Sequence, residues 1–192
     1  SKDVDAALEK AGTVLKATYL HPYQMHGSVG SSCAVADVRE GKVTLWSATQ
    51  AVWHMRSTTA MLLNVPAEQV QVIYRRGSGC YGINGADTVS FDAALLSQGV
   101  GKPVRVQLSR KDEMAWENYG NALVIDQRAG IGPDGTILAW DCEAWAPNRG
   151  ARPGYDRPGN VVTGWLAGFE PAPIEPRAAA DPTGFNNGNN AA

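Results

Sequence analysis

The sequence predicts an α+β fold, in which a mixed sheet with β-hairpins is combined with two amphipathic helices. Two hairpin patterns point to this class: Glu40-Gly41 separates two short β-rich runs, and the tetrapeptide GPDG at residues 132–135 separates two longer ones. The third pattern is one strand–Gly-loop–helix–strand unit over residues 70–108. Hairpins beside a single unit of this kind are typical of α+β rather than of a repeating α/β fold.

The first part of the chain alternates between β-rich runs and one helical pattern. The expected elements are a short helix or linker over residues 1–12, a strand over 15–20, short strands over 34–38 and 43–47, and a helix over 51–64. In this helix Val52, Met55 and Thr59 recur at helical spacing, and Pro66 follows its end. Thr49 precedes the helix and is a candidate N-cap.

The second part holds the strand–Gly-loop–helix–strand unit and the longer hairpin. The expected elements are a strand over residues 70–74, a helix over 86–97, a strand over 104–108, a helical turn over 110–118, and strands over 123–129 and 136–145. Val89, Ala93 and Leu96 share one face of the helix, and Gly101 and Pro103 follow its end.

Composition divides the chain near residue 147. Residues 1–146 carry the periodic patterns and are expected to form one α+β domain. Residues 147–192 are rich in Pro, Gly, Asn and Ala, and they predict an extended, irregular C-terminal tail. A segment of that composition cannot form a core of its own, so we expect it to lie on an existing surface or to lead into a further region.

Charge and cysteine content exclude several classes of function. The chain has 192 residues, 44% of them hydrophobic, and a formal net charge of -2, so nothing favours a nucleic-acid partner. The three cysteines, Cys33, Cys80 and Cys142, are widely spaced and form no C-x-x-C pair, which argues against a disulfide framework, a zinc site or an iron–sulfur site. No apolar run approaches the roughly 20 residues of a membrane span.

The glycine loop between the strand at 70–74 and the following helix reads GSGCYG over residues 77–82 and satisfies G-x-G-x-x-G. One interpretation is an NADP-linked oxidoreductase that uses Gly77, Gly79, Gly82 and Arg110. A second is a structural tight turn in a non-catalytic interaction domain. The insertion of residues 83–85 before the helix weakens the dinucleotide interpretation, because the helix should begin near the third glycine.

A third interpretation, a cradle for another anionic cofactor, comes from a family resemblance carried by several motifs in order. These are TLWSATQ, an amphipathic helix, NVPAEQVQVIYRRGSGCYGINGAD, ALLSQGVGKPVRVQLSRKDE and RAGIGPDGTILAWDCEAW. Together they resemble the molybdopterin-binding subunit of the xanthine dehydrogenase and aldehyde oxidase family, and most of all its nicotinate and isoquinoline dehydrogenase-like members. The resemblance covers roughly residues 15–150 and corresponds to the N-terminal part of the molybdenum-binding region.

The resemblance implies specific cofactor-binding residues. Gln50 matches a glutamine whose neutral amide lies beside the molybdenum centre in the family, whereas without the resemblance it would only help to begin a helix. Gly79, Cys80, Tyr81 and Gly82 match the family's glycine loop, with Tyr81 in place of its phenylalanine. The backbone N–H groups around that aromatic residue are expected to meet the cofactor. Cys80 is an extra residue, which makes the alignment ambiguous by one position.

Two further residues are candidates for the substrate pocket. Asn84 follows the glycine loop at the place where some family members carry a substrate-orienting glutamate, and Asp87 nearby is expected to cap the next helix. His26 belongs to a polar, aromatic loop similar in content to one near the family's substrate funnel. No metal ligand is expected in the chain, and the family's general-base glutamate lies far downstream, so no catalytic residue is expected here either.

The implied activity is that of a molybdenum hydroxylase, which hydroxylates an aldehyde or an N-heterocycle oxidatively. Its cofactor is molybdopterin, expected in the cytosine dinucleotide form, with [2Fe-2S] clusters in a partner subunit. The expected partners are the remainder of the molybdenum subunit, the iron–sulfur subunit, cytochrome c and a small-molecule substrate. The chain alone is expected to be inactive and to hold no cofactor. The compartment stays open between the bacterial cytoplasm and the periplasmic face of the inner membrane.

Overall fold

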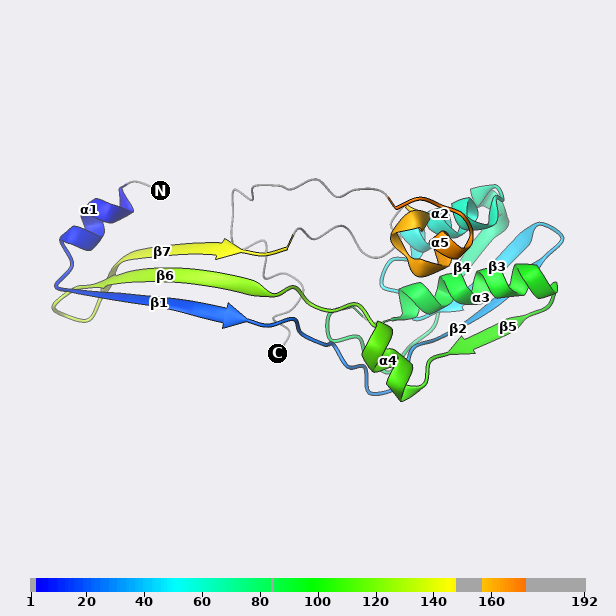
Figure 1. The fold of residues 1–192 in the computed structure, drawn as a ribbon, viewed down its shortest axis with the longest axis horizontal. Coiled ribbons are helices and arrows are strands. Elements are labelled where there is room, and N and C mark those ends of the chain that lie inside the picture. Colours follow the sequence, from blue (N-terminus) through cyan, green and yellow to red (C-terminus); the bar gives the residue numbers. More distant parts are fainter. Residues whose placement is uncertain (1–2, 84, 148–156, 172–192) are drawn as a thin grey trace. The chain divides into compact units, whose positions relative to one another are not determined.

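The computed structural model describes residues 3–83, 85–147 and 157–171, and its strands form two separate sheets (Figure 1). One is a three-stranded sheet with the order β1-β6-β7, and the other is a four-stranded sheet with the order β4-β3-β2-β5. Each sheet belongs to its own compact unit. The α+β class is therefore confirmed, although the β-structure is divided between two sheets. Among the described residues no helix is long and apolar enough to cross a membrane.

The three-stranded sheet is antiparallel throughout. It consists of β1 (Thr13–His21), β6 (Leu123–Ile131) and β7 (Ile137–Trp145), with β6 in the centre. The turn between β6 and β7 closes with a 2.8 Å hydrogen bond from the N–H of Gly132 to the carbonyl of Thr136. These strands and the hairpin confirm the sequence prediction for this part of the chain. The short helix α1 (Val4–Glu9) precedes β1 and is capped by the side chain of Asp3.

The four-stranded sheet is mixed and consists of β2 (Cys33–Arg39), β3 (Lys42–Ser47), β4 (Val70–Tyr74) and β5 (Val104–Gln107). β2 and β3 form the expected hairpin, whose turn residues Glu40 and Gly41 both have positive φ values, 52° and 75°. Side chains along β2 and β3 alternate between buried and partly exposed, as a sheet covered on one face requires.

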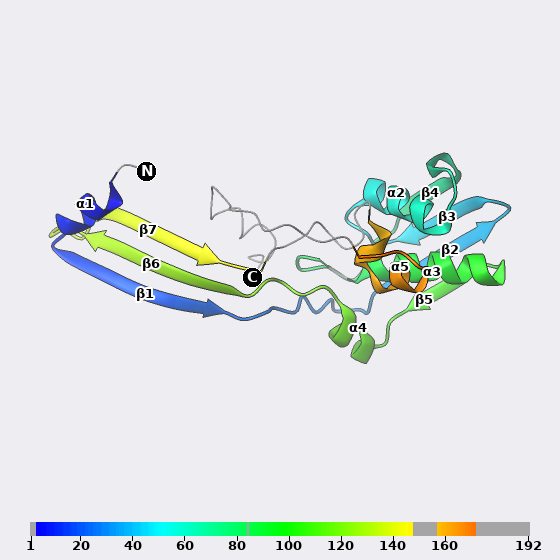
Figure 2. The same ribbon diagram turned by 45° about the horizontal axis from the view of Figure 1, so that its top comes forward.

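Helices α2 (Val52–Leu63) and α3 (Ala86–Val100) cover the buried face of this sheet (Figure 2). The core between helices and sheet is built from apolar residues of both; its members include Ala34, Ala36, Val43, Leu45, Met55, Leu62, Leu63, Val89, Phe91 and Ala94. Phe91 of α3 is 1% exposed and Leu45 of β3 is fully buried, and α3 packs mainly over β2.

Two strand–helix–strand units run through the sheet, whereas the sequence predicted one. The expected unit, β4–α3–β5, is present, but β4 and β5 lie at opposite edges of the sheet. The second unit is β3–α2–β4, in which β3 and β4 are adjacent and parallel, with Val43 opposite Val70 and Ser47 opposite Tyr74. A short 3₁₀ helix, η1 (Ala67–Gln69), leads from α2 into β4. This parallel pairing brings the carboxyl ends of β3 and β4 together.

Two helix-cap predictions are wrong. The N-cap of α2 is Ala51, and Thr49 instead lies two residues earlier with its hydroxyl bonded to Asp87. The N-cap of α3 is Gly85, so Asp87 lies within the first turn of the helix rather than at its cap. In both cases the side chain hydrogen-bonds to a residue 38 positions away, and sequence-based cap rules consider only local partners.

The segment expected to be an irregular tail needs one correction. Within it, η2 (Pro158–Asn160) and α5 (Val162–Leu166) are helical, and Pro158, Val161 and Thr163 are buried. The proposed boundary between residues 146 and 147 remains a prediction. The helical turn expected over residues 110–118 is present as the helix α4 (Arg110–Trp116), which begins with a capping box between Ser109 and Asp112.

Candidate functional site

The candidate site begins where β3 and β4 end side by side. Because the two strands are parallel, the segments that follow them leave the same edge of the sheet. The N–H of Arg75 donates a 2.8 Å hydrogen bond to the carbonyl of Ser47, which keeps the two segments together past the last paired residues. Gln50 lies on the first segment and the glycine loop on the second. The side-chain Nε2 of Gln50 is 3.0 Å from the Sγ of Cys80, so the structure brings these two predicted residues together.

The glycine loop has a backbone that few residues adopt. Gly79 and Gly82 have φ values of 108° and 133°, and between them Tyr81 has a φ of 45°. The Tyr81 ring folds back over Gly79, where an added Cβ would lie 2.9 Å from the ring. Within the described part of the chain, the main-chain N–H groups of Cys80, Tyr81 and Gly82 have no hydrogen-bond partner. The bend therefore presents consecutive donors that a bound ligand could use.

A buried polar network supports the segment that carries Gln50. The hydroxyl of Thr49 donates a 2.6 Å hydrogen bond to Asp87 in α3 and accepts one of 3.0 Å from the N–H of Ala51. The N–H of Thr49 donates to the hydroxyl of Ser47, which in turn accepts from Ser90 at 2.7 Å. Thr49, Asp87, Ser47 and Ser90 are each at most 2% exposed. Gln50 thus projects from a backbone that this network fixes to α3.

The segment before β2 is held by α4, and sequence analysis did not anticipate this contact. Glu113 is fully buried and accepts hydrogen bonds from the N–H and hydroxyl of Ser32, at 2.6 and 2.8 Å. Glu117, which is 4% exposed, accepts from the N–H groups of His26 and Gly27, at 2.7 and 2.9 Å. The only local signal was two glutamates four positions apart, because their partners lie 81 to 91 residues away.

Of the two substrate-pocket candidates, the structure describes His26 but not Asn84. His26 is 8% exposed, and its Nδ1 lies 2.7 Å from the carbonyl oxygen of Asn118. This geometry fits a side chain that holds the end of α4 to the segment before β2. Asn84 lies outside the described residues.

Arg110 does not serve as the arginine of a dinucleotide-binding site. Its guanidinium donates hydrogen bonds to the carbonyl oxygens of Ser28, at 2.7 Å, and Val29. The glycine loop is also separated from α3, which begins only after its N-cap at Gly85. The NADP-linked interpretation is therefore wrong, since the cation is engaged by the protein and the helix N-terminus is displaced from the third glycine.

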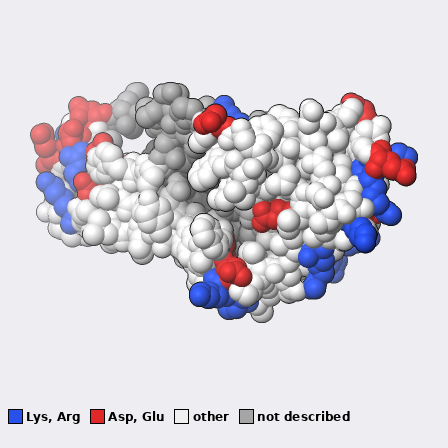
Figure 3. Space-filling model, turned by 45° about the vertical axis from the view of Figure 1, so that its right-hand side comes forward, with Lys and Arg blue, Asp and Glu red and all other residues white. Residues whose placement is uncertain are grey.

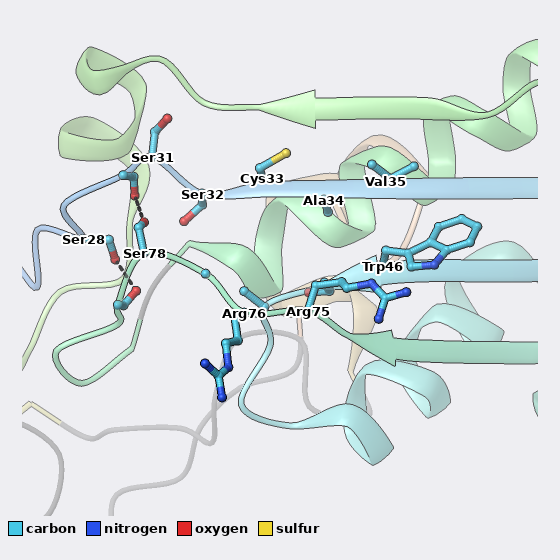
Figure 4. Close-up of a pocket in the computed structure, with 15 residues that line it drawn as sticks. Ser28, Ser31, Ser32, Cys33, Ala34, Val35, Trp46, Arg75, Arg76 and Ser78 are labelled. Atoms are coloured by element: carbon cyan, nitrogen blue, oxygen red, sulfur yellow. Dashed lines mark hydrogen bonds between the residues drawn. The ribbon is translucent and has the colours of Figure 1, made fainter.

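A pocket of about 220 Å³ lies beside the glycine loop at the ends of β3 and β4 (Figure 4). Its lining includes Arg75, Arg76, Trp46 and Ser78, and none of the described residues that line it is Asp or Glu. Figure 4 shows Arg75 extending along the sheet toward Trp46, whereas Arg76 extends away from it. The two guanidinium groups give this pocket a positive character.

The side chains of the site offer hydrogen-bond donors rather than metal ligands. Among the described residues, no group of three or more His, Cys, Asp or Glu side chains could hold a metal ion. Much of the face shown in the space-filling view is uncharged (Figure 3). The arrangement suits a ligand with its own metal or polar groups, bound through main-chain N–H groups and one amide.

Comparison with known proteins gives a consistent family. A family model described as the molybdopterin cofactor-binding domain matches residues 1–163. A nicotinate dehydrogenase subunit of Pseudomonas putida is 42% identical over 149 residues, which cover 78% of this chain and 13% of that protein. The aldehyde oxidoreductase molybdenum-binding subunit PaoC of Escherichia coli is 31% identical over 149 residues, which cover 76% of this chain and 20% of that protein.

Solved structures share the fold at low sequence identity. CO dehydrogenase from Oligotropha carboxidovorans aligns with a TM-score of 0.64 and 22% identity, over 75% of this chain and 18% of that one. Aldehyde oxidoreductase from Desulfovibrio gigas aligns with a TM-score of 0.65 and 15% identity, over 76% and 16%. The chain therefore spans a fifth or less of the length of each of these four relatives.

Proposed function

Because this chain belongs to the molybdopterin cofactor-binding domain family, we propose that it forms part of the cofactor pocket in a molybdenum hydroxylase subunit. The observation that carries this proposal is the position of Gln50, whose amide lies 3.0 Å from Cys80 at the bend of the glycine loop. The main-chain N–H groups of Cys80, Tyr81 and Gly82, which have no partner among the described residues, lie at the same bend. One side-chain amide and three main-chain donors would then face one ligand.

The chemistry of these donors fits molybdopterin. Main-chain N–H groups and a neutral amide can donate to oxygen or sulfur ligands and to the polar edge of a pterin without adding charge. Gly82 has no side chain, which lets its backbone approach a large ring closely, whereas the missing side chain of Gly79 makes room for the Tyr81 ring. We infer that Gln50, Gly79, Cys80, Tyr81 and Gly82 hold the cofactor, with the loop acting mainly through its backbone.

When bound, the cofactor supplies the molybdenum redox chemistry that oxidises a substrate carbon and takes up two electrons. The residues of this chain orient the cofactor and keep donors fixed toward it, which costs no rearrangement during the reaction. We propose an N-heterocycle as substrate rather than an aldehyde, since the relative with 42% identity is a nicotinate dehydrogenase subunit. The general-base glutamate is expected in a further region of the molybdenum subunit.

The cofactor form and the partners are finer proposals. We propose the cytosine dinucleotide form of molybdopterin, a partner subunit with [2Fe-2S] clusters and electron transfer to cytochrome c. Two relatives, the nicotinate dehydrogenase chain of Pseudomonas putida and a probable xanthine dehydrogenase chain of Bacillus subtilis, are each named as one subunit of their enzyme. Their names support an enzyme with more than one kind of chain.

The test uses the longest polypeptide that contains this chain, purified with its partner subunits. Replacing Gln50 with Glu keeps the size of the side chain but removes its N–H donors. We expect kcat to fall by roughly 100-fold, as the loss of one donor to a reacting centre typically costs. Turnover of nicotinate and molybdenum content are measured together.

Gln71→Glu is the matched control, because Gln71 is an exposed glutamine on β4. It should leave both quantities unchanged. Equal activity of the Gln50 and Gln71 variants, at equal molybdenum content, would remove Gln50 from the cofactor site.

A further inference from the structure

Residues 26–32 form a segment that α4 and the residue after it hold near both of its ends. Its N–H groups at residues 26, 27 and 32 donate to the buried carboxylates of Glu117 and Glu113. Its carbonyl oxygens at residues 28 and 29 accept from the guanidinium of Arg110. Hydrogen bonds to charged groups are stronger than those between neutral groups, so this segment is fixed to α4 by several strong contacts.

The same segment is also fixed to the glycine loop by two serines. The hydroxyl of Ser28 donates a 3.0 Å hydrogen bond to the carbonyl of Gly79, and the hydroxyl of Ser78 donates one of 2.7 Å to the carbonyl of Gly30 (Figure 4). The two bonds run in opposite directions between the same two backbone stretches. A Cβ on Gly30 would lie 2.6 Å from the Ser78 hydroxyl oxygen, so the approach requires glycine there.

The glycine loop needs such support. Tyr81 is a non-glycine residue with a φ of 45°, a conformation that is unfavourable for a bulky side chain unless surrounding contacts enforce it. Tyr81 is 51% exposed, so packing alone fixes it poorly. Cys80, Tyr81 and Gly82 have no main-chain N–H bonds to other described residues. The contacts from Ser28 and Ser78 lie directly before this stretch.

We propose that Ser28 and Ser78 are positioning residues for the cofactor loop, and that α4 anchors them through Arg110, Glu113 and Glu117. The chain of contacts runs from α4 to residues 26–32, across the two serine hydroxyls to the carbonyl of Gly79 and the backbone of Ser78, and so to the donors at residues 80–82. The serines touch no reacting atom and act through the loop. This inference rests on the proposed function, since the loop matters only if its donors meet a cofactor.

The first test measures loop motion in the 192-residue chain without cofactor. ¹⁵N relaxation gives order parameters for the amides of residues 79–82, which should be near the value of about 0.85 typical of rigid backbone. Ser78→Val removes the hydroxyl, whereas Ser78→Thr keeps it on a side chain of the same branched shape. We expect the order parameters to fall below about 0.6 in the valine variant and to stay near the parent's in the threonine variant.

The matched control is Ser31→Ala, a serine of the same segment whose hydroxyl accepts from Gln107 rather than bonding to the glycine loop. It should leave residues 79–82 unchanged. Alkylation of Cys80, followed by mass spectrometry, gives an independent readout and should be several-fold faster in Ser78→Val only. The proposal would be overturned by equal order parameters at residues 79–82 in the valine and threonine variants. It would also be overturned if these residues were already mobile in the parent chain. Loss of order spread over α3 and the sheet would overturn it too, because that indicates general destabilisation.

The second test connects the loop to the cofactor. In the longer polypeptide, Ser78→Val should lower molybdenum content at least several-fold and Ser78→Thr should restore it, since small displacements of binding groups are costly. If Ser78→Val makes the loop mobile but leaves molybdenum content unchanged, the positioning role of the serines is contradicted, whereas the proposed function is not. The Gln50→Glu experiment does not depend on these serines, so failure of the proposed function is distinguishable from failure of this inference.

Discussion

At the scale of single residues, the structure shows side chains whose partners lie far away in sequence. Thr49 precedes α2, and local rules make it a cap, yet its hydroxyl donates to Asp87, which is 2% exposed. The same hydroxyl accepts from the N–H of Ala51. This arrangement fixes the backbone on which Gln50 is carried.

Thr49→Val should destabilise the fold by about 1–3 kcal/mol, because it removes a buried hydroxyl that bonds to Asp87 and to the N–H of Ala51 while preserving side-chain volume. Urea unfolding followed by tryptophan fluorescence measures this change. Thr44→Val is the control: Thr44 lies on the partly exposed face of β3 and should change the free energy of unfolding by less than about 0.5 kcal/mol. Equal losses at the two positions would argue against the network.

Sequence alone could predict only those residues of the candidate site that belong to a recognisable motif. Gln50 and residues 79–82 stand in recognisable sequence patterns, and the structure brings Gln50 and Cys80 into contact. The contacts of Ser28, Ser78 and Glu113 are side-chain bonds across 48 to 81 positions. One sequence contains no signal for such pairs, since a buried serine or glutamate resembles an exposed one until the chain is folded.

At the scale of elements, the short helix α4 holds the segment before β2 through a buried carboxylate. It has seven residues, yet Glu113 is fully enclosed and holds the start of β2 through Ser32. Glu113→Gln should lower the free energy of unfolding by about 2–3 kcal/mol, because an amide replaces a charged acceptor of two hydrogen bonds. Thermal and urea unfolding measure the loss. Glu68→Gln, at an exposed position in η1, should be neutral.

The β2–β3 hairpin turn offers a stabilising substitution. Glu40 has a φ of 52°, which suits Asn or Gly better than a longer side chain. Glu40→Asn should raise the free energy of unfolding by roughly 0.5–1 kcal/mol. A rise in melting temperature measured by circular dichroism is the expected result, and a decrease would show that the Glu40 side chain contributes a contact of its own.

Helices and strands with clear periodicity were predicted well, whereas the pairing of strands distant in sequence was not. Alternation located the strands of both hairpins, but nothing in the residues of β3 and β4 indicates that these strands pair in parallel. The helices η2 and α5 lie in a stretch rich in Pro and Gly, where local composition disfavours helix. Their stability comes from packing against the core, through Val161 among others.

At the scale of the whole molecule, the contact between α5 and α3 makes stability depend on pH. Burial raises the pKa of Asp92 in α3, and a hydrogen bond from Thr163 lowers it to a smaller extent. The folded state therefore binds the proton of the Asp92 carboxyl group more tightly than the unfolded chain does. The stabilisation that this proton gives to the folded state is present below the ordinary aspartate pKa and is lost as the pH rises through the raised pKa.

Asp92→Asn should therefore stabilise the chain at about pH 7 and lose this advantage as the pH falls to about 4, where carboxyl groups become protonated. Asn keeps an oxygen that accepts from Thr163. Urea unfolding of both proteins across this range measures the difference. A gap that grows toward acid would contradict the direction of the Asp92 pKa shift.

The chain on its own is predicted to be free of molybdenum. It covers 13% of the nicotinate dehydrogenase subunit of Pseudomonas putida, so we expect most of a cofactor pocket to lie outside these residues. Elemental analysis of the purified 192-residue protein is the measurement, with the longer polypeptide as positive control. Stoichiometric molybdenum in the short protein would show that these residues suffice.

The parallel alignment of β3 with β4 has a consequence for how the pocket forms. The contact between Gln50 and Cys80 depends on the parallel pairing of β3 with β4, two strands that α2 separates in sequence. Formation of the pocket therefore requires a non-local strand pairing, not a local turn alone. A ligand that binds both segments needs this strand pairing for its full affinity. By mass action, its binding would in turn stabilise the pairing. Saturation with cofactor should thus slow opening of this strand pair more than that of the β2–β3 hairpin.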